Sequence, residues 1–368
     1  MKTRFAKLAG IDYPIVAFTH CRDVLIAVTR AGGLGVLGTA RTTPEQLEVE
    51  LTKIDEALGG MPYGVDILFP ASETQRPQID IAELEAQVPP QHRAFAQQLI
   101  ERFHIPKSTG THGATHATGL VSTLDAARER TEVMLRHPVK VLATALGPAP
   151  ADVLEAMHRR GGIVGGLVGS AEHARRHVAA GAEFIVAEGT EAGGHTGEIS
   201  TMVLVPEVVD AVPVPVLAAG GIGGGRQVAA ALALGAEGVW TGSIWLTTIE
   251  GDDDPIVKEK LLKATSRDTI RSRCASGKPV RQLRTPWVMA WESKDSPGTL
   301  PMPLQGLLVQ DIVGAIYEHR VTEVMGTPVG QIVGQMNQIR SARDVFLELV
   351  EGFVESATRL SDLIAVED

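Results

Sequence analysis

Short apolar runs alternate along the chain with amphipathic segments, and a glycine often separates an amphipathic segment from the run after it. This pattern occurs in the segments TRAGGLGVLG, HRRGGIVGGLVG, AAGAEFIVAEG and ALGAEGVWTG. In each of these segments the glycine is typical of a helix end, and the apolar run is typical of a strand buried on both faces. The amphipathic segments have helical spacing, because Leu47, Leu51, Ile54 and Leu58 after Pro44 repeat every three or four positions. The pattern predicts strands that alternate with helices.

Eight of the apolar runs predict strands. They cover residues 15–18, 34–37, 64–68, 139–146, 163–168, 184–187, 216–219 and 238–240. Eight strands that alternate with helices favour a closed (β/α)8 TIM barrel, an α/β fold, over residues 1–250. An open, doubly wound sheet is the alternative.

Three segments depart from this rhythm. The connection after the third strand exceeds the usual length of roughly 2–6 residues, so we expect residues 70–138 to form a long insertion with a helix in PPQHRAFAQQLIERFH and a lid over the barrel mouth. Residues 251–320 lack the alternation of apolar runs and amphipathic segments, which predicts a small second domain there. In the C-terminal segment 321–368, the periodic stretch SARDVFLELVEGFVESATRLSDLI predicts a helix that packs back on the barrel.

The composition excludes several classes of protein. Hydrophobic residues make up 44% of the 368 residues and charged residues 21%, as in globular chains and unlike disordered, collagen-like or coiled-coil chains. The formal charge of -10 argues against nucleic acid or an anionic membrane as the main partner. Cys21 and Cys274 are too few for a disulfide framework, and the N-terminus lacks the apolar core of a signal peptide. We therefore expect a cytoplasmic protein.

The loop after the sixth strand holds a candidate reactive group. A barrel places such groups at the carboxyl ends of its strands, and the sequence at the end of the sixth strand is AEGTEAGGHTG. Gly193 and Gly194 allow the backbone to approach a flat ligand closely, and His195 offers an imidazole that titrates near neutral pH. Taken alone, this motif more often marks a glycine-rich turn with a surface histidine.

The loops after the seventh and eighth strands change that balance. They read AAGGIGGGRQ, leading into a helix, and WTGSIW. Backbone N–H groups at Gly220, Gly221, Gly242 and Ser243 would converge where barrels hold a phosphate, beside a helix N-terminus. Together with the histidine loop they predict a phosphorylated planar cofactor. The alternative is that these glycines serve only tight packing.

These motifs carry a family resemblance. The chain resembles the nitronate monooxygenase (formerly 2-nitropropane dioxygenase) family of FMN-dependent TIM-barrel flavoproteins, which is related to flavin-dependent enoyl-acyl-carrier-protein reductases. The matching pieces are RAGGLGVLG, YGVDILF, VAEGTEAGGHTG, VPVLAAGGIGGGRQVAAALALGAEGVWTGS, SGKPVRQLRTPW and LPMPLQ. They lie between residues 14 and 305, outside the long insertion.

The resemblance implies FMN as the cofactor and assigns roles to individual residues. His195 matches the catalytic histidine of the family. Asp66 stands where a flavin-contacting Asn is usual, and Gln335 resembles a C-terminal Gly-Gln of the family. The residues that match the loops around the flavin and its phosphate are Glu188, Gly193, Gly194, Gly220, Gly221, Thr241, Gly242 and Ser243.

Three departures from the family pattern concern the substrate. Phe18, Thr19 and His20 replace the Ala-Pro-Met wall that is common beside the flavin, and Thr19 and His20 become candidates for substrate contact. Asp66 is acidic where a neutral amide is usual. Glu188 stands where nitronate-oxidising members often have Gln, and EGTEAGGH is closer to the reductase branch.

Three hypotheses for function follow. The resemblance implies oxidation of an alkyl nitronate with O2, in which His195 positions the nitronate or acts as its base. Glu188 favours instead an NAD(P)H-dependent reductase of an acyl or enoyl thioester, with His195 as proton donor. A flavin-binding protein without turnover is the third. In each case we expect a small-molecule ligand and no metal site, and homo-oligomer formation is left open.

A basic stretch bears on the second hypothesis. Its residues are Arg267, Arg271, Arg273, Lys278, Arg281 and Arg284. One hypothesis is that they bind the phosphates of NADPH or of a coenzyme A thioester. The simpler interpretation is that these charged residues form a solvent-exposed face without a ligand.

Overall fold

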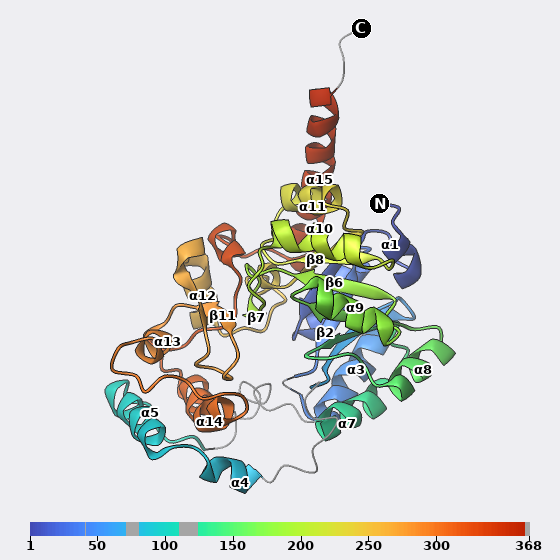
Figure 1. Ribbon diagram of the computed structural model, residues 1–368. Coiled ribbons are helices and arrows are strands. Elements are labelled where there is room, and N and C mark those ends of the chain that lie inside the picture. The colour runs from blue at the N-terminus through green and yellow to red at the C-terminus, as the bar shows by residue number, and fades with distance from the viewer. Residues whose placement is uncertain (41, 71–80, 110–123, 365–368) are drawn as a thin grey trace.

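A closed barrel of eight parallel strands forms the centre of the molecule (Figure 1). The computed structural model describes residues 1–40, 42–70, 81–109 and 124–364. The barrel strands are β1 (Ile15–Thr19), β2 (Leu34–Gly38), β3 (Gly64–Leu68), β4 (Val141–Ala145), β5 (Ile163–Val168), β6 (Phe184–Glu188), β8 (Val216–Ala219) and β9 (Gly238–Thr241). Because β1 pairs in parallel with β9, the sheet closes. The predicted (β/α)8 fold is confirmed, and the open sheet is wrong.

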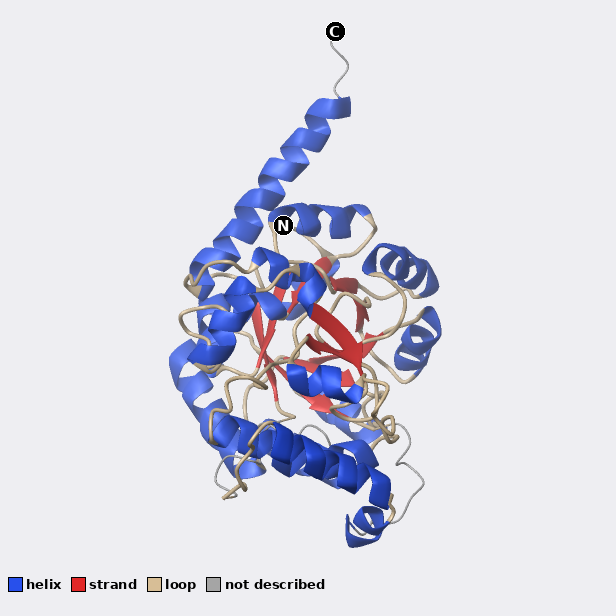
Figure 2. Ribbon diagram, turned by 90° about the vertical axis from the view of Figure 1, so that its left-hand side faces the viewer, coloured by secondary structure: helices blue, strands red, loops and turns tan. Residues whose placement is uncertain are grey.

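Helices surround the barrel in the expected alternation. They are α1 (Arg4–Ala9), α2 (Arg22–Arg30), α3 (Pro44–Leu58), α7 (Leu124–Met134), α8 (Ala151–Arg159), α9 (Ala171–Ala179), α10 (Thr201–Ala211) and α11 (Gly225–Ala233). Figure 2 shows them as an outer layer around the strands. Among the described residues, no helix combines the length and the apolar character needed to cross a bilayer.

The sequence specifies α3 at both ends. The Thr43 hydroxyl accepts the backbone N–H of Gln46, and the Gln46 side chain accepts the backbone N–H of Thr43, which is a capping box. Pro44 occupies the first turn, and Gly59 ends the helix at φ 57°. The apolar positions between these ends are buried, as their spacing predicts.

One strand is shorter than its apolar run. The run over 139–146 forms β4 only from Val141 to Ala145. Leu146 adopts φ 70°, a left-handed conformation that an extended strand does not allow, so the strand ends before it.

The strands bury side chains on both faces, as their continuous apolar runs predict. Inward-facing residues such as Val36, Phe184 and Leu217 fill the barrel interior. Their neighbours along the strands, such as Leu37 and Ile185, pack outward against the helices. This alternation with a period of two decides which residues at the ends of the strands face the interior.

A small antiparallel sheet lies beside the barrel. It consists of β10 (Thr269–Ser272), β11 (Val280–Leu283) and the two-residue β7 (Gly194–His195), in that order. The helices of this region are α12 (Pro255–Lys263), α13 (Pro286–Trp291) and α14 (Leu304–Glu318), with single turns η2 (Ser243–Trp245), η3 (Ser266–Asp268) and η4 (Gln331–Gln335). The sheet thus links the histidine loop to the segment after residue 250. The division of the chain into separate domains stays a prediction.

The long insertion after β3 is described in part. It contains α4 (Ile81–Ala86) and α5 (Pro90–Arg102), the second of which was expected from the sequence, and both contact α14. The Phe95 ring packs edge-on against Trp291, with ring centroids 5.0 Å apart. Residues 71–80 and 110–123, on which much of the lid prediction depends, lie outside the described residues.

The last helix, α15 (Ala342–Ile364), contacts the barrel layer over its first half only. Val345, Phe346 and Leu349 are buried, and α15 contacts α11 and α2. A Cβ on Gly225 would lie 2.1 Å from the carbonyl carbon of Gly352, so the two helices cross at backbone distance. Beyond that crossing α15 projects from the body (Figures 1 and 2), and Leu363 is 67% exposed. The expected packing on the barrel is therefore limited to the first half.

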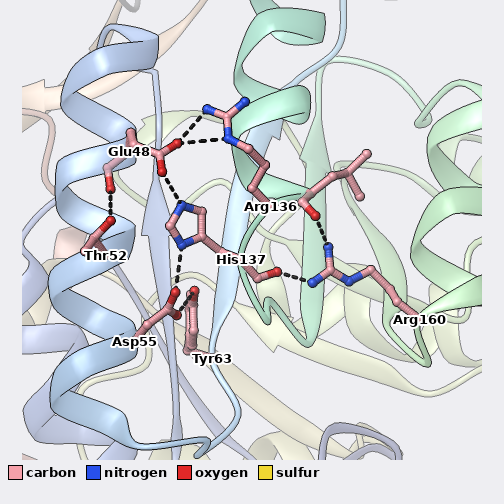
Figure 3. A network of polar contacts seen from close by, with 8 residues as sticks. Glu48, Thr52, Asp55, Tyr63, Arg136, His137 and Arg160 are labelled. Carbon is pink, nitrogen blue, oxygen red and sulfur yellow. Dashed lines mark hydrogen bonds and ion pairs between the residues drawn. The ribbon is translucent and has the colours of Figure 1, made fainter.

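A polar network joins three elements at the amino ends of the strands (Figure 3). The His137 ring lies 2.7 Å from Asp55 Oδ2 and 3.3 Å from Glu48 Oε1, so it bridges two carboxylates of α3. The Tyr63 hydroxyl donates to Asp55 Oδ1 at 2.6 Å, and Arg136 pairs with Glu48. Burial and the Asp55 carboxylate raise the pKa of Tyr63, so the hydroxyl stays protonated and remains a donor. The network fixes α3 to the start of β3 and to the end of α7.

We expect Tyr63→Phe to lower the free energy of unfolding by about 1–3 kcal/mol, because Asp55 loses a buried donor. Chemical denaturation measures this loss. The network lies at the end of the barrel opposite the candidate site, so ligand binding should not change. A variant as stable as the wild type would show that the Tyr63 hydrogen bond adds nothing to stability.

Candidate active site

A cavity of about 390 Å³ opens at the carboxyl ends of the barrel strands. Its volume falls within the roughly 300–1,000 Å³ of small-molecule and cofactor sites. Twelve of the thirteen residues that the sequence singles out line it: Thr19, His20, Asp66, Glu188, Gly193, Gly194, His195, Gly220, Gly221, Thr241, Gly242 and Ser243. The thirteenth, Gln335, is exposed on η4 near Gly224 and does not line the cavity.

The alternation along the strands brings distant residues to the floor of this cavity. Because Phe184 and Val186 face the barrel interior, Glu188 also faces it at the end of β6. Asp66 faces inward on β3 between the outward residues Val65 and Ile67.

His195 is held by the small sheet. Its backbone pairs with Val280 of β11, and its Nε2 atom lies 2.8 Å from the hydroxyl of Ser276 in the turn between β10 and β11. Burial, and secondarily the charge of Lys278, lower the pKa of His195 to about 4. The imidazole is therefore neutral at pH 7, and Nδ1 is the ring nitrogen that Ser276 does not contact.

Charged side chains that do not line the cavity fix the loop on both sides of His195. Glu191 accepts the backbone N–H of Thr201 at the start of α10 (2.9 Å). Arg281 donates to the carbonyl of Thr190 (2.8 Å), and Arg271 donates to that of Thr196 (3.3 Å). Two of the six basic residues therefore hold the histidine loop, which neither interpretation of the basic stretch anticipated. The other four, Arg267, Arg273, Lys278 and Arg284, are exposed.

The loops after β8 and β9 form a cradle of backbone groups. Gly220 and Gly221 have φ of 95° and 72°, which only glycine adopts readily, and the Thr201 hydroxyl donates to the carbonyl of Gly220 (2.9 Å). The Thr241 hydroxyl donates to the carbonyl of Val16 (2.8 Å), so the backbone of Thr241 is the part available to a ligand. A Cβ on Gly242 would meet only Phe18, at 3.9 Å.

These residues fit the phosphate of FMN. Gly221 is followed within four residues by α11, whose N-terminus favours an anion, and the Ser243 hydroxyl accepts the N–H of Gly330 (2.8 Å), which keeps that turn in place. No Lys or Arg is among the described residues that line the cavity. Backbone N–H groups and the helix end would therefore supply the recognition of the phosphate.

The first strand provides an aromatic wall. The Phe18 ring stacks on Trp240 with centroids 6.0 Å apart and meets His20 edge-on at 5.3 Å. His20 Nδ1 lies 2.9 Å from the carbonyl of Gly38, and since a carbonyl can only accept, Nδ1 carries the proton. Thr19 accepts the N–H of Cys21 (3.0 Å). These contacts hold the wall against β2 and β9.

The segment after residue 250 forms an apolar roof over the cavity. Its lining side chains include Trp287, Val288, Val313, Ile316 and Val324. None of the described residues of the insertion, 70, 81–109 and 124–138, lines the cavity, and α4 and α5 contact α14 instead.

Two residues of the site were missed in the sequence. Ser276 is fully buried and bonds to the ring of His195, and Glu191 anchors the histidine loop. Ser276 lies in the motif SGKPVR and Glu191 in EGTEAGGH, and membership in these motifs was the signal that could have identified them. A motif gives no pairing between segments, so their contacts could not be inferred.

Comparison with known proteins agrees with this geometry. The chain is 49% identical over 378 residues to a protein of Mycobacterium tuberculosis described as a "putative monooxygenase", covering 99% of this chain and all of that protein. It is 30% identical to an octahydroindene-carboxyl-CoA dehydrogenase of the same organism, covering 80% of this chain and 69% of that one.

The fold also matches a solved structure. FabK from Thermotoga maritima superposes with a TM-score of 0.75 and 27% identity, covering 99% of this chain and all of that one. The family model named nitronate monooxygenase matches residues 2–352. The chain therefore belongs to the nitronate monooxygenase family of flavin-dependent oxidoreductases.

Proposed function

We propose that this protein is an FMN-dependent oxidoreductase that oxidises alkyl nitronates with O2. The observation that carries the proposal is the neutral imidazole of His195, which lines the same cavity as the backbone cradle of Gly220, Gly221 and Gly242. When bound there, FMN would take electrons from the substrate and pass them to O2.

The protein's own groups have three tasks in this proposal. The cradle and the start of α11 would hold the phosphate, the aromatic wall of Phe18 and Trp240 bounds the cavity on the side of β1 and β9, and the apolar roof excludes water. His195 accepts a proton at Nδ1 or positions the nitronate, which suits an imidazole that is unprotonated at pH 7. The base role requires that Nε2–H donates to Ser276.

A second candidate is an NAD(P)H-dependent reductase or dehydrogenase of an acyl or enoyl thioester. Glu188 and the large apolar roof favour it, as does the CoA-ester dehydrogenase among the relatives. The exposed Arg273 and Lys278, on the turn that carries Ser276, would meet the phosphates of such a ligand. The neutral state of His195 weighs against it, because a proton donor must hold its proton at working pH.

An anaerobic experiment separates the two candidates. The FMN-loaded protein is mixed without O2 with an alkyl nitronate, with NADH or with NADPH, and the flavin absorbance is followed. We expect the nitronate to bleach the flavin and O2 to restore it. Bleaching by NAD(P)H alone would replace the proposal with the thioester candidate. A protein that binds no FMN would contradict both.

Ser276 is proposed to position His195. We expect Ser276→Ala to lower kcat about tenfold with little change in KM, because the ring loses the bond that sets its tautomer and orientation. FMN affinity should stay at the wild-type value. Steady-state kinetics and a flavin titration measure these effects. An unchanged kcat would show that the hydroxyl serves only the turn, through its bond with Lys278 N–H.

A further inference from the structure

Two carboxyl groups face the same cavity from different strands. Asp66 lies on β3 and is 5% exposed, and Glu188 ends β6 and is half-buried. The Oδ1 atom of Asp66 is buried and accepts no hydrogen bond from any described residue. A buried carboxylate oxygen without a donor is costly, so the group either keeps a proton or meets a ligand there.

Among the described residues that line the cavity, no Lys or Arg lies beside this pair. The residues opposite Asp66 on the neighbouring strands are Gly38 and Ala143, which carry no charge. The other titratable side chains that line the cavity within the described part of the chain are His20, Cys21, His195, Asp252, Asp253, Cys274 and Tyr317. His195 is neutral, and the remaining acids add only negative charge.

The strand order indicates where this pair would lie relative to a bound flavin. In the strand order β1–β2–β3–β4–β5–β6–β8–β9, β3 lies opposite β8. A ligand whose phosphate binds at the loops after β8 and β9 would therefore extend across the cavity toward Asp66, and Glu188 would lie beside its path, because β6 stands between β3 and β8 in this order. The pyrimidine side of a flavin ring presents carbonyl oxygens, which accept hydrogen bonds and repel carboxylates.

We propose that Asp66 and Glu188 form an electrostatically coupled acid pair, one proton of which is donated in a hydrogen bond to the ring of bound flavin, so that flavin binding takes up a proton wherever both groups are ionised. This inference rests on the proposed function, because it requires that FMN binds in the cavity.

Two like charges in one cavity resist simultaneous ionisation. Burial raises the pKa of Asp66 to about 7, and burial together with the Asp66 charge raises that of Glu188 to about 8. Below about pH 8 the pair still holds at least one proton, so the Kd for FMN changes little. At higher pH a proton must be taken up on binding, so the Kd rises by up to tenfold per pH unit.

The test is a titration of the protein with FMN from pH 7 to 9.5, followed by flavin fluorescence. The matched variant is Asp66→Asn/Glu188→Gln, which keeps both side-chain shapes and cannot ionise. We expect the wild-type Kd to rise at least tenfold over this range and the double variant to stay flat. The FMN phosphate is dianionic throughout and affects both proteins equally.

Single variants test the electrostatic coupling between the two carboxyl groups. Asp66→Asn removes the like charge that raises the Glu188 pKa, so the transition should move to lower pH. Asp252→Asn removes a carboxyl that lines the cavity outside the barrel strands and should keep the wild-type transition. A transition that disappears with Asp252→Asn would overturn the assignment to the pair.

Calorimetry of the wild type keeps the proposal falsifiable if the variants fail to fold. Binding of FMN at pH 8.5 in two buffers of different ionisation enthalpy should report net uptake of a proton, up to one per FMN. Binding without proton uptake, or parallel pH profiles in wild type and double variant, would overturn this inference and leave the proposed function intact. Absence of FMN binding at pH 7 would overturn both.

Discussion

Replacing His195 with alanine is expected to reduce turnover by about 100-fold or more, while FMN content and melting temperature stay nearly unchanged. The backbone of His195, and not its ring, pairs with β11, and the one hydrogen bond of the ring within the described residues is to Ser276. Loss of that bond costs about 1 kcal/mol. Steady-state kinetics on the substrate identified anaerobically, flavin absorbance and thermal melts measure the three quantities. His173→Ala, on the exposed face of α9, is the matched control.

The pH dependence adds a second check on the same residue. An unperturbed histidine titrates near ~6.5, whereas burial and Lys278 lower the pKa of His195 to about 4. As a base, it should therefore stay active from pH 7 down to about 5. An acid limb near 6.5 that His195→Ala removes would contradict the neutral assignment. Full activity in the variant would make His195 a turn residue, and flavin loss would move the catalytic assignment to Thr19 or His20.

The barrel was predictable because its signals are local. Each helix end and each buried run is coded within about ten residues, as the capping box of Thr43 and the glycine after α3 illustrate. The cradle was predictable for the same reason, since Gly220 and Gly221 follow β8 directly. The limits of the strands were less predictable: β1, β2, β6 and β9 are each one residue longer than predicted, and β4 is shorter and ends before Leu146, whose left-handed conformation has no signal in the sequence.

Contacts between distant segments were not predictable. The strand β7 has two residues and exists only because β11, far along the chain, pairs with it. Ser276 and Arg281 reach the histidine loop through that pairing, and their roles depend on it. Asp66 and Glu188 were each identified, yet their common cavity depends on barrel closure and on the alternation of side chains along two strands. A single sequence without coupled positions contains no signal for such pairs.

The cradle can be tested at a position where the protein itself leaves room. A Cβ on Gly242 would have only Phe18 within 4 Å, at 3.9 Å, and φ there is -124°. A larger side chain would therefore extend into the cavity without displacing backbone. At Gly221 the φ of 72° strains any other residue, so flavin loss there would not distinguish a blocked site from a distorted loop. Gly242 is the sharper position for this reason.

Gly242→Leu is accordingly expected to raise the Kd for FMN by at least 100-fold, or about 2.7 kcal/mol, because the side chain occupies the space of the phosphate or its linker. Gly242→Ala and Gly242→Val should give graded increases in the Kd. The stabilities of the FMN-free proteins should agree within about 0.5 kcal/mol, and they must be compared without flavin because bound FMN stabilises the wild type. Ala179→Leu on the exposed side of α9 controls for the added bulk. Wild-type FMN affinity in the leucine variant would place the phosphate elsewhere and remove the geometric basis of the proposed site.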